Sequence, residues 1–413
     1  RALTGWTIVG ISQIIGALVI KPRACWRAHA RRGKEETMKS MRDCFRPASY
    51  AAAFLIVSII YVPAPLAQSD GGWQKKWDQT LAQAKTEGKV VVLGPPGDQI
   101  RDALTRGFAN AFPDTTIEFC GAGGGELATR MKAERDAGVY SVDVLINGTS
   151  TANSYFKPMK ALEPIEPALI LPEVIDPKNW RDNRLEFSDR TTKFDLVFTT
   201  QNNVPLIFNQ AQVKTGEVDE LKDLLDPKWK GKIAVQDPIP SGTGNGVFRW
   251  VWHVLGPEKT KDFYRKIRAQ AAAVDRDQRR QIEWIAQGKY PLHFGPGTIM
   301  QQLEKRGLKF GVVPYFKDYG AYLTPGFGSA MFVNRAPHPN AGKVFLNWLL
   351  TKEGQTAFSK GMGYVSRRLD VPTDHVPSYW VPKDGVKYWP GYYEEDATMS
   401  PEQITFLKSI FGR

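Results

Sequence analysis

The chain contains few of the residues that form disulfide frameworks and metal centres. Its 413 residues include only three cysteines and five histidines. Cys25 and Cys44 precede residue 68, so Cys120 is the one cysteine in the rest of the sequence, and no disulfide can form within that part. The histidines show none of the short spacings that metal ligands take. We therefore expect a free, buried Cys120, no metal and no cofactor.

The motifs of several enzyme classes are missing as well. The sequence has no G-x-S-x-G nucleophile elbow, and the glycine run at 121–125 is not followed by the spacing of a dinucleotide fingerprint. A nucleophile such as Ser241 or Cys120 would need a His base and a carboxylate, and no Cys/His signature provides them. We predict that the protein is not an enzyme, with a secreted enzyme kept as an alternative.

An apolar run near the N-terminus is too short to cross a bilayer comfortably. From Met38 onward, basic residues precede an apolar run at 51–62, which a small-residue exit follows. This order is typical of a secretory signal peptide, whereas a membrane span needs about 20 apolar residues. We predict that residues 1–67 are a leader, with the signal peptide at 38–67 and an over-extended start at 1–37, and that the protein is periplasmic. Two short apolar segments that form a membrane hairpin are the alternative.

The strong positive charge of the chain comes mainly from this leader. The whole sequence has a formal net charge of +12, and the first 67 residues hold ten Lys or Arg against three Asp or Glu. The remainder is left with a net charge of about +5, which is unremarkable for a soluble protein of this size. The charge therefore gives no reason to expect a nucleic-acid partner.

Helical and strand patterns alternate regularly after residue 72. Apolar residues at helical spacing alternate with short buried runs, first at 73–146 and again at 232–313. Strands separated by such helices form parallel sheets that helices cover on both faces. We predict an α/β fold of two lobes, each a mostly parallel sheet flanked by helices. The expected lobes are 70–202 with 325–370, and 203–324, followed by a tail, 371–413, that packs on a lobe.

Gly-, Ser- and Thr-rich loops follow several of the predicted strands. The runs at 121–125, 148–151, 241–246 and 295–298 each precede a predicted helix. Glycine permits close backbone approach, hydroxyls donate hydrogen bonds, and a helix start carries unpaired N–H groups with positive potential. A single loop of this kind is usually only a turn and an N-cap. Together, at the strand ends of an open α/β sheet, they predict an anion site.

One of these loops carries a family resemblance. The segment DPIPSGTGNG at 237–246 resembles the DP-x-x-SGTG signature of bacterial extracellular solute-binding proteins of family 1. The segments at 87–94, 141–149 and 324–368 are similar to that family in order and spacing. The resemblance covers roughly residues 73–369 and implies the type II periplasmic-binding fold, in which hinge crossings join two lobes. It also implies that the protein serves an ABC importer.

The resemblance implies a ligand site between the lobes, formed by strand-end loops of both. We expect a small-molecule solute, an anion by the loop chemistry, to be captured by hinge closure and passed to ABC transporter permease subunits. The protein is expected to act as a monomer with no nucleic-acid partner. Carried over by position, the candidate ligand-binding residues are Gly124, Gly125, Thr149, Ser241, Thr243, Gly244, Gly297 and, less directly, Tyr322.

Other ligands and roles remain open within the same fold. The family includes ferric-iron binders that use an adjacent tyrosine pair with a His and a carboxylate. The matching stretch near 295–305 contains no such pair, and Tyr392 and Tyr393 are adjacent but lie in the tail. A ferric-iron receptor and a ligand-sensing partner of a membrane receptor are therefore kept as alternatives.

Overall fold

The computed structural model describes residues 72–240, 242–297 and 299–412. The predicted leader at 1–67 and the candidate Ser241 lie outside these residues. Within the described ranges, no helix is both long and apolar enough to cross a membrane.

The first lobe is built on a seven-stranded sheet in the order β2-β1-β3-β14-β6-β5, with β4 also paired to β14. Its strands are β1 (Lys89–Gly94), β2 (Thr116–Gly121), β3 (Val144–Asn147), β4 (Leu162–Glu163), β5 (Glu186–Phe187), β6 (Leu196–Val197) and β14 (Ser329–Val333). β1 pairs in parallel with β2 and β3, and the other pairs are antiparallel.

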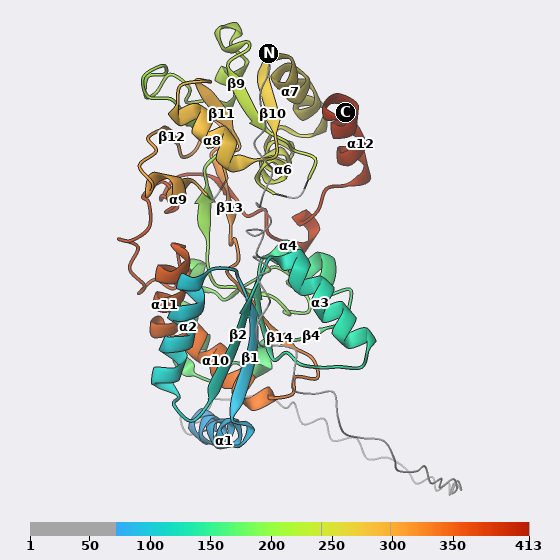
Figure 1. Cartoon of the computed structure of the whole chain (residues 1–413), viewed down its shortest axis with the longest axis vertical. Coiled ribbons are helices and arrows are strands. Elements are labelled where there is room, and N and C mark those ends of the chain that lie inside the picture. Colours follow the sequence, from blue (N-terminus) through green and yellow to red (C-terminus); the bar gives the residue numbers. More distant parts are fainter. Residues whose placement is uncertain (1–71, 241, 298, 413) are drawn as a thin grey trace, which may run out of the picture. The chain divides into compact units, whose positions relative to one another are not determined.

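Helices cover both faces of this sheet (Figure 1). The helices of this lobe are α1 (Gly72–Glu87), α2 (Asp98–Ala111), α3 (Gly124–Asp136), α4 (Thr149–Thr151), η1 (Ala152–Phe156), η2 (Glu166–Ala168), α5 (Pro172–Ile175), η3 (Pro177–Asn179), η4 (Arg181–Asn183), α10 (Pro339–Leu350) and α11 (Lys352–Met362). Val92 faces a core with Phe108 of α2 and Trp348 of α10. Its neighbour Leu93 faces a second core with Met131 of α3, because successive side chains of a strand point to opposite faces.

The second lobe is built on a five-stranded sheet in the order β10-β9-β11-β8-β12. Its strands are β8 (Leu206–Phe208), β9 (Ile233–Gln236), β10 (Ala271–Asp275), β11 (Leu292–Phe294) and β12 (Gly311–Val313). Its helices are η5 (Leu221–Leu225), η6 (Pro227–Trp229), α6 (Thr243–Leu255), α7 (Pro257–Gln270), α8 (Gln278–Ala286), α9 (Met300–Glu304) and α12 (Pro401–Phe411). β9 pairs in parallel with β10 and β11, whereas β8 pairs antiparallel with β11 and β12.

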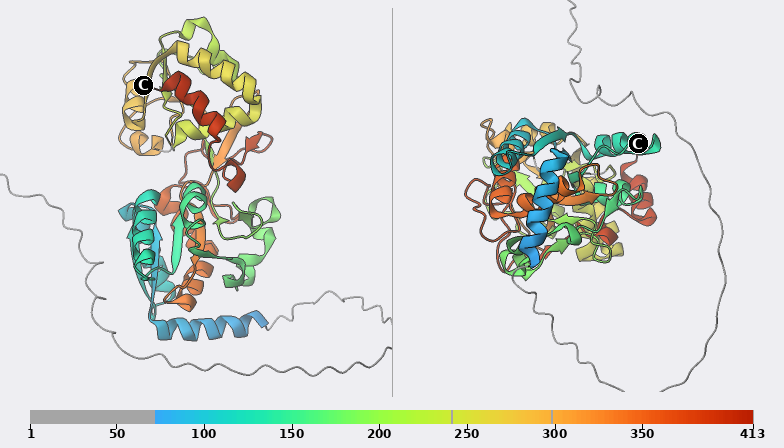
Figure 2. Two further views of the ribbon diagram at one scale, coloured as in Figure 1. Left: turned by 90° about the vertical axis from the view of Figure 1, so that its right-hand side faces the viewer. Right: turned by 90° about the horizontal axis from the view of Figure 1, so that it is seen from below.

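Apolar side chains fill both faces of the second sheet. Phe294 of β11 lies in one core with Trp250 of α6, and Leu407 of α12 joins the same core. Ile207 of β8 faces a second core with Ile285 of α8. Figure 2 shows α12 lying on the second lobe, and α1 lying across the end of the first.

Three short strands form a third sheet between the lobes. β7 (Gln201–Asn203) pairs antiparallel with β13 (Ala321–Thr324), and β15 (Tyr388–Trp389) pairs in parallel with β13. β7 and β13 are the two expected chain crossings. β15, with the short helix η7 (Glu394–Asp396) that follows it, comes from the tail and adds a crossing that the sequence did not predict.

The sheets of the two lobes contain more antiparallel strand pairs than the sequence predicts. Each has three neighbouring parallel strands at one side, as expected for strand–helix–strand units. The antiparallel pairs come from strands beside the chain crossings, such as β14 and β8, which enter the sheet without a preceding crossover helix in that lobe. The α/β two-lobed fold is thus confirmed, with mixed sheets.

Candidate ligand-binding site

The predicted loops lie at two sheet edges. Because β1, β2 and β3 run parallel, the loops that follow them share one edge of the first sheet. The loops after β9, β10 and β11 share one edge of the second sheet for the same reason. All of the described candidates except Tyr322 belong to one of these two groups.

Four helices at these edges begin at glycine without a side-chain cap. The N-cap residues of α2, α3, α4 and α6 are Gly97, Gly123, Gly148 and Gly242, and none of them makes a side-chain cap hydrogen bond. Side-chain oxygens do cap the starts of α8, α11 and α12. The starts of α2, α3, α4 and α6 therefore keep N–H groups available to an anion, whereas Asp277 caps α8 at the same edge as α6. α7 also begins at an uncapped glycine, so a missing cap points to a ligand only together with the strand-end position.

In the first lobe the candidates gather around Asn147, the last residue of β3. The Oδ1 atom of Asn147 accepts a hydrogen bond from the backbone N–H of Gly148 over 2.8 Å. A Cβ atom on Gly124 would lie 2.8 Å from that Oδ1 atom, so only glycine lets the start of α3 approach the end of β3 this closely. Thr149 is buried at the start of α4, directly after this contact.

This group has an unpaired hydrogen-bond donor and open space beside it, and both suit a ligand. The side chain of Asn147 is buried, and its Nδ2 atom has no hydrogen-bond partner among the described residues. A buried donor without a partner is costly, because it has lost its hydrogen bonds to water. At Gly125 an added Cβ would meet nothing within 4 Å, so the space beside the first turn of α3 is open.

In the second lobe the candidates gather around Thr243, the first residue of α6. Gln278, at the start of α8, donates a hydrogen bond from Nε2 to the Oγ1 atom of Thr243 over 3.1 Å. Gly297 has a φ of +77°, and a Cβ there would lie 2.8 Å from the same Oγ1 atom. Gly244 is packed equally closely, since its Cβ would lie 2.8 Å from the carbonyl oxygen of Gln236. The loops after β9, β10 and β11 thus meet at one hydroxyl group.

This arrangement sets the role of the Thr243 hydroxyl. A hydroxyl group has one donor hydrogen and accepts through its lone pairs. Since Oγ1 already accepts from Gln278, the hydroxyl hydrogen remains to be donated to another group. The site therefore offers a neutral donor here, next to the uncapped start of α6.

Tyr322 reaches the second group of candidates from a hinge strand, since its hydroxyl donates to the carbonyl oxygen of Thr243 over 3.5 Å. It lies on β13, and its side chain is buried with Trp250 and Trp389. Its hydroxyl group contacts the Nδ2 atom of Asn203, which donates to it across the antiparallel pair of β7 and β13. Burial raises the pKa of Tyr322 well above its ordinary value. The structure thus places Tyr322 between the lobes, with its hydroxyl already engaged within the protein.

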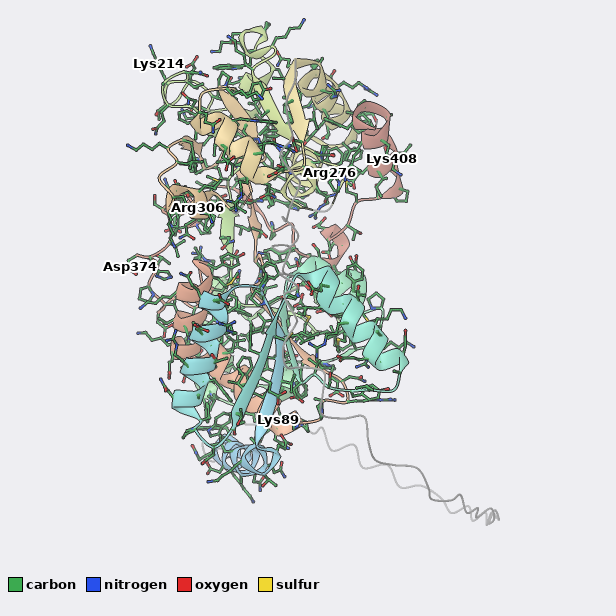
Figure 3. The ribbon with its side chains drawn as sticks, viewed as in Figure 1. Lys89, Lys214, Arg276, Arg306, Asp374 and Lys408 are labelled. Carbon is green, nitrogen blue, oxygen red and sulfur yellow. The ribbon has the colours of Figure 1, made fainter. Side chains whose placement is uncertain are left out.

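A basic residue lies at the edge of the second sheet. Arg276 follows β10 and is exposed, with its Nε atom 3.2 Å from Oδ2 of Asp237, the residue after β9 (Figure 3). The side chain of Arg276 is 72% exposed, so this ion pair lies at the surface. Only the Nε atom of the guanidinium donates to Asp237. Because the arginine side chain is exposed, its other N–H groups are open to solvent at this edge.

Sequence reasoning missed Asn147 and Gln278. Asn147 precedes the loop at 148–151, and its value as a donor depends on burial, which no local pattern reports. Gln278 follows β10, a strand that the sequence did not predict because its residues, Ala-Ala-Ala-Val-Asp, begin with strong helix formers. A correct prediction of β10 would have placed Gln278 at the same edge as Thr243.

The described residues provide no evident metal centre. They contain no group of three or more His, Cys, Asp or Glu residues that could hold a metal ion. Of the tyrosine pair in the tail, Tyr393 is engaged within the protein, since its hydroxyl donates to Oε1 of Glu186 over 2.7 Å and Arg190 lies over its ring. Cys120 is free as expected, but it is half-buried rather than buried, and Arg130 donates to its sulfur over 3.2 Å.

Most of the chain matches a known protein family. A family model described as bacterial extracellular solute-binding protein matches residues 103–385. The chain belongs to this family. A Salmonella typhi periplasmic protein, provisionally named for binding 2-aminoethylphosphonate, is 25% identical over 215 residues. The match covers 50% of this chain and 62% of that relative, so the chain spans less than two thirds of the relative's length.

Several solved structures share the fold of this chain. A Trichodesmium protein in complex with iron and citrate has a TM-score of 0.60 at 17% identity, with 79% of this chain and 100% of that one covered. The periplasmic binding protein AfuA from Actinobacillus pleuropneumoniae, with exogenous fructose-6-phosphate bound, has a TM-score of 0.58 at 17% identity, with 78% and 98% covered. These similarities establish a two-lobed binding-protein fold for the chain, and the bound molecules belong to those proteins.

Proposed function

We propose that the protein is a periplasmic receptor that captures a small anionic solute and delivers it to the permease subunits of an ABC importer. One observation carries the proposal. The helices α3 and α6 begin at Gly123 and Gly242 without a side-chain cap, and each start lies where the strands of a sheet end, beside the donor Asn147 or Thr243. Backbone N–H groups at a helix start attract anions through the helix dipole. The names of two similar proteins, which refer to a phosphonate and a sugar phosphate, agree with this class of ligand.

The donors in both groups favour an anion over a cation. The hydroxyl hydrogen of Thr243, the Nδ2 atom of Asn147 and the guanidinium of Arg276 would all donate to a ligand. None of the candidate residues has a carboxylate, whereas hard cations are bound by several oxygen ligands. A small molecule that carries a phosphonate, phosphate, carboxylate or sulfonate group fits these donors best.

Closure of the two lobes on the ligand is the proposed mechanism. In this proposal the first lobe comprises 70–202 and 325–370, the second comprises 203–324, and 371–413 is a tail. A ligand that contacts both lobes stabilises the closed form relative to the open form by its extra contacts. The protein would work as a monomer, exported by the predicted leader at 1–67.

A thermal-shift screen tests this function. The panel contains 2-aminoethylphosphonate, inorganic phosphate, fructose-6-phosphate, ferric citrate and glucose. A ligand present at a hundred times its Kd stabilises the native state by about 2.7 kcal/mol, so a true ligand stands out clearly. We expect at least one phosphonate or phosphate ester to raise the Tm. A rise with ferric citrate alone would favour the iron receptor, and a rise with glucose alone would remove the anion assignment.

A further inference from the structure

The segment Gly391–Asp396 of the tail makes polar contacts with the first lobe. The backbone N–H of Glu394 donates to the carbonyl oxygen of Ser188 over 2.9 Å. The Oε2 atom of Glu394 lies 2.6 Å from the Nζ atom of Lys157, directly after η1. Next to it, the Tyr393 hydroxyl donates to the buried Glu186. Both an ion pair and buried hydrogen bonds therefore hold this segment to the first lobe.

The same segment also contacts the second lobe. Arg249 of α6 donates from Nη1 to the carbonyl oxygen of Gly391 over 3.2 Å and to the carbonyl oxygen of Asp396. Its Nε atom donates to Oδ1 of Asn245 over 2.9 Å, one turn earlier in α6, so the guanidinium is held in place from both sides. The chain then continues into α12, whose Leu407 is buried in the core of the second lobe.

These contacts reach the helices that begin at the proposed site. Arg249 belongs to α6, which starts at Thr243. Lys157 ends the helical stretch of α4 and η1, which starts at Thr149. One short segment is therefore bonded to the later turns of both helical stretches. Any movement that changes the distance between Thr149 and Thr243 must either carry the segment along or break one set of its bonds.

We propose that Gly391–Asp396 is a strap across the hinge, which restrains the relative motion of the two lobes and thereby limits how far the site opens. The two crossings β7 and β13 form a hinge without it, so the strap is an added restraint. This inference gains its functional meaning from the proposed hinge closure. The test uses no ligand. A negative result would therefore contradict the strap alone and would leave the anion assignment untouched.

The test measures the distance between spin labels on the two lobes of the ligand-free protein. Labels are attached at Arg106→Cys on α2 and Lys259→Cys on α7, in a background in which Cys25, Cys44 and Cys120 are all replaced by serine. The first strap variant combines Glu394→Ala with Tyr393→Phe and removes side-chain bonds to the first lobe. The second, Arg249→Met, removes the guanidinium hydrogen bonds to the second lobe. The control, Asp136→Ala, breaks an exposed ion pair with Lys132 of similar length, 2.7 Å, that has no contact with the strap.

We expect both strap variants to broaden the distance distribution and to extend it to longer distances, while the control matches the parent protein. Circular dichroism and the Tm establish that each variant is folded. The two variants remove contacts with different lobes, so if one of them fails to fold the other decides the question. A folded strap variant with the distribution of the control would overturn the proposal.

Discussion

The side-chain amide of Gln278 donates to the Oγ1 atom of Thr243 over 3.1 Å, which joins the starts of α6 and α8. Because the hydroxyl accepts from Gln278, its own hydrogen is available to a ligand. The contact also explains why glycine is needed at 297, where a side chain would occupy the same space.

Replacing Thr243 by valine should therefore weaken anion binding without unfolding the protein. Valine keeps the shape but removes the donor, and a charged acceptor left without its partner costs about 1–3 kcal/mol, or roughly fivefold to 150-fold in Kd. Calorimetric titration with the strongest anion of the screen measures the change. The control is Thr86→Val, on an exposed face of α1, which should leave the Kd unchanged. Equal affinities for the two variants would remove Thr243 from the site.

Two adjacent glycines in the first turn of α3 should respond oppositely to alanine. At Gly124 a Cβ would lie 2.8 Å from Oδ1 of Asn147 and closer still to Oγ1 of Thr151, so Gly124→Ala should destabilise the fold by about 1–3 kcal/mol. At Gly125 the space is open, and alanine should be neutral or stabilise by up to about 1 kcal/mol through its helix propensity. Urea unfolding compares the two variants. Equal stabilities would contradict the packing of α3 against β3.

His293 should make the protein sensitive to acid. Burial lowers its pKa to about 4, from an ordinary value of 6.5, while its Nδ1 atom contacts the carbonyl oxygen of Ala234. Between these values the unfolded chain binds more protons than the folded one, so stability falls as the pH falls. From pH 7 to pH 5 this contribution is about 2 kcal/mol, and His293→Asn should lack it. Urea unfolding at both pH values checks this. An identical loss in the variant would show that other groups dominate.

Asp195 should have the opposite effect at higher pH. Burial raises its pKa from 3.8 to about 7, although Ser188 donates a hydrogen bond to its Oδ2 atom over 2.7 Å. The folded chain then binds more protons than the unfolded chain between pH 4 and 7, so stability falls as the pH rises through that range. Asp195→Asn should remove about 2–3 kcal/mol of this loss between pH 5 and pH 8. Unfolding curves that shift equally with pH in both proteins would rule out a buried, raised-pKa carboxyl at 195.

Local sequence patterns predicted most of the fold. The alternation that starts at Trp73 predicted α1 to β3 with small errors at the ends, because helix and strand periodicity is a local property. β10 was missed because three alanines favour a helix, and the parallel pair with β9 overrides that preference. β15 could not be predicted at all, since two residues form a strand only by pairing with β13.

The candidate site was predictable in outline only. The glycine and threonine loops could be placed at strand ends from their order in the chain. The roles of Asn147 and Gln278 depend on contacts between segments far apart in sequence, as does the engagement of Tyr322 with Asn203. Composition gave no signal for the strap either, because its contacts with Lys157 and Arg249 join residues more than a hundred positions apart.

A crystal structure of the protein with the anion that gives the largest thermal shift would test the central claim most directly. The account predicts that the anionic group lies between the lobes, within hydrogen-bonding distance of backbone N–H groups at the starts of α3 and α6 and of the Thr243 hydroxyl. An anion bound elsewhere on the protein, or bound between the lobes with its anionic group away from both helix starts, would contradict it.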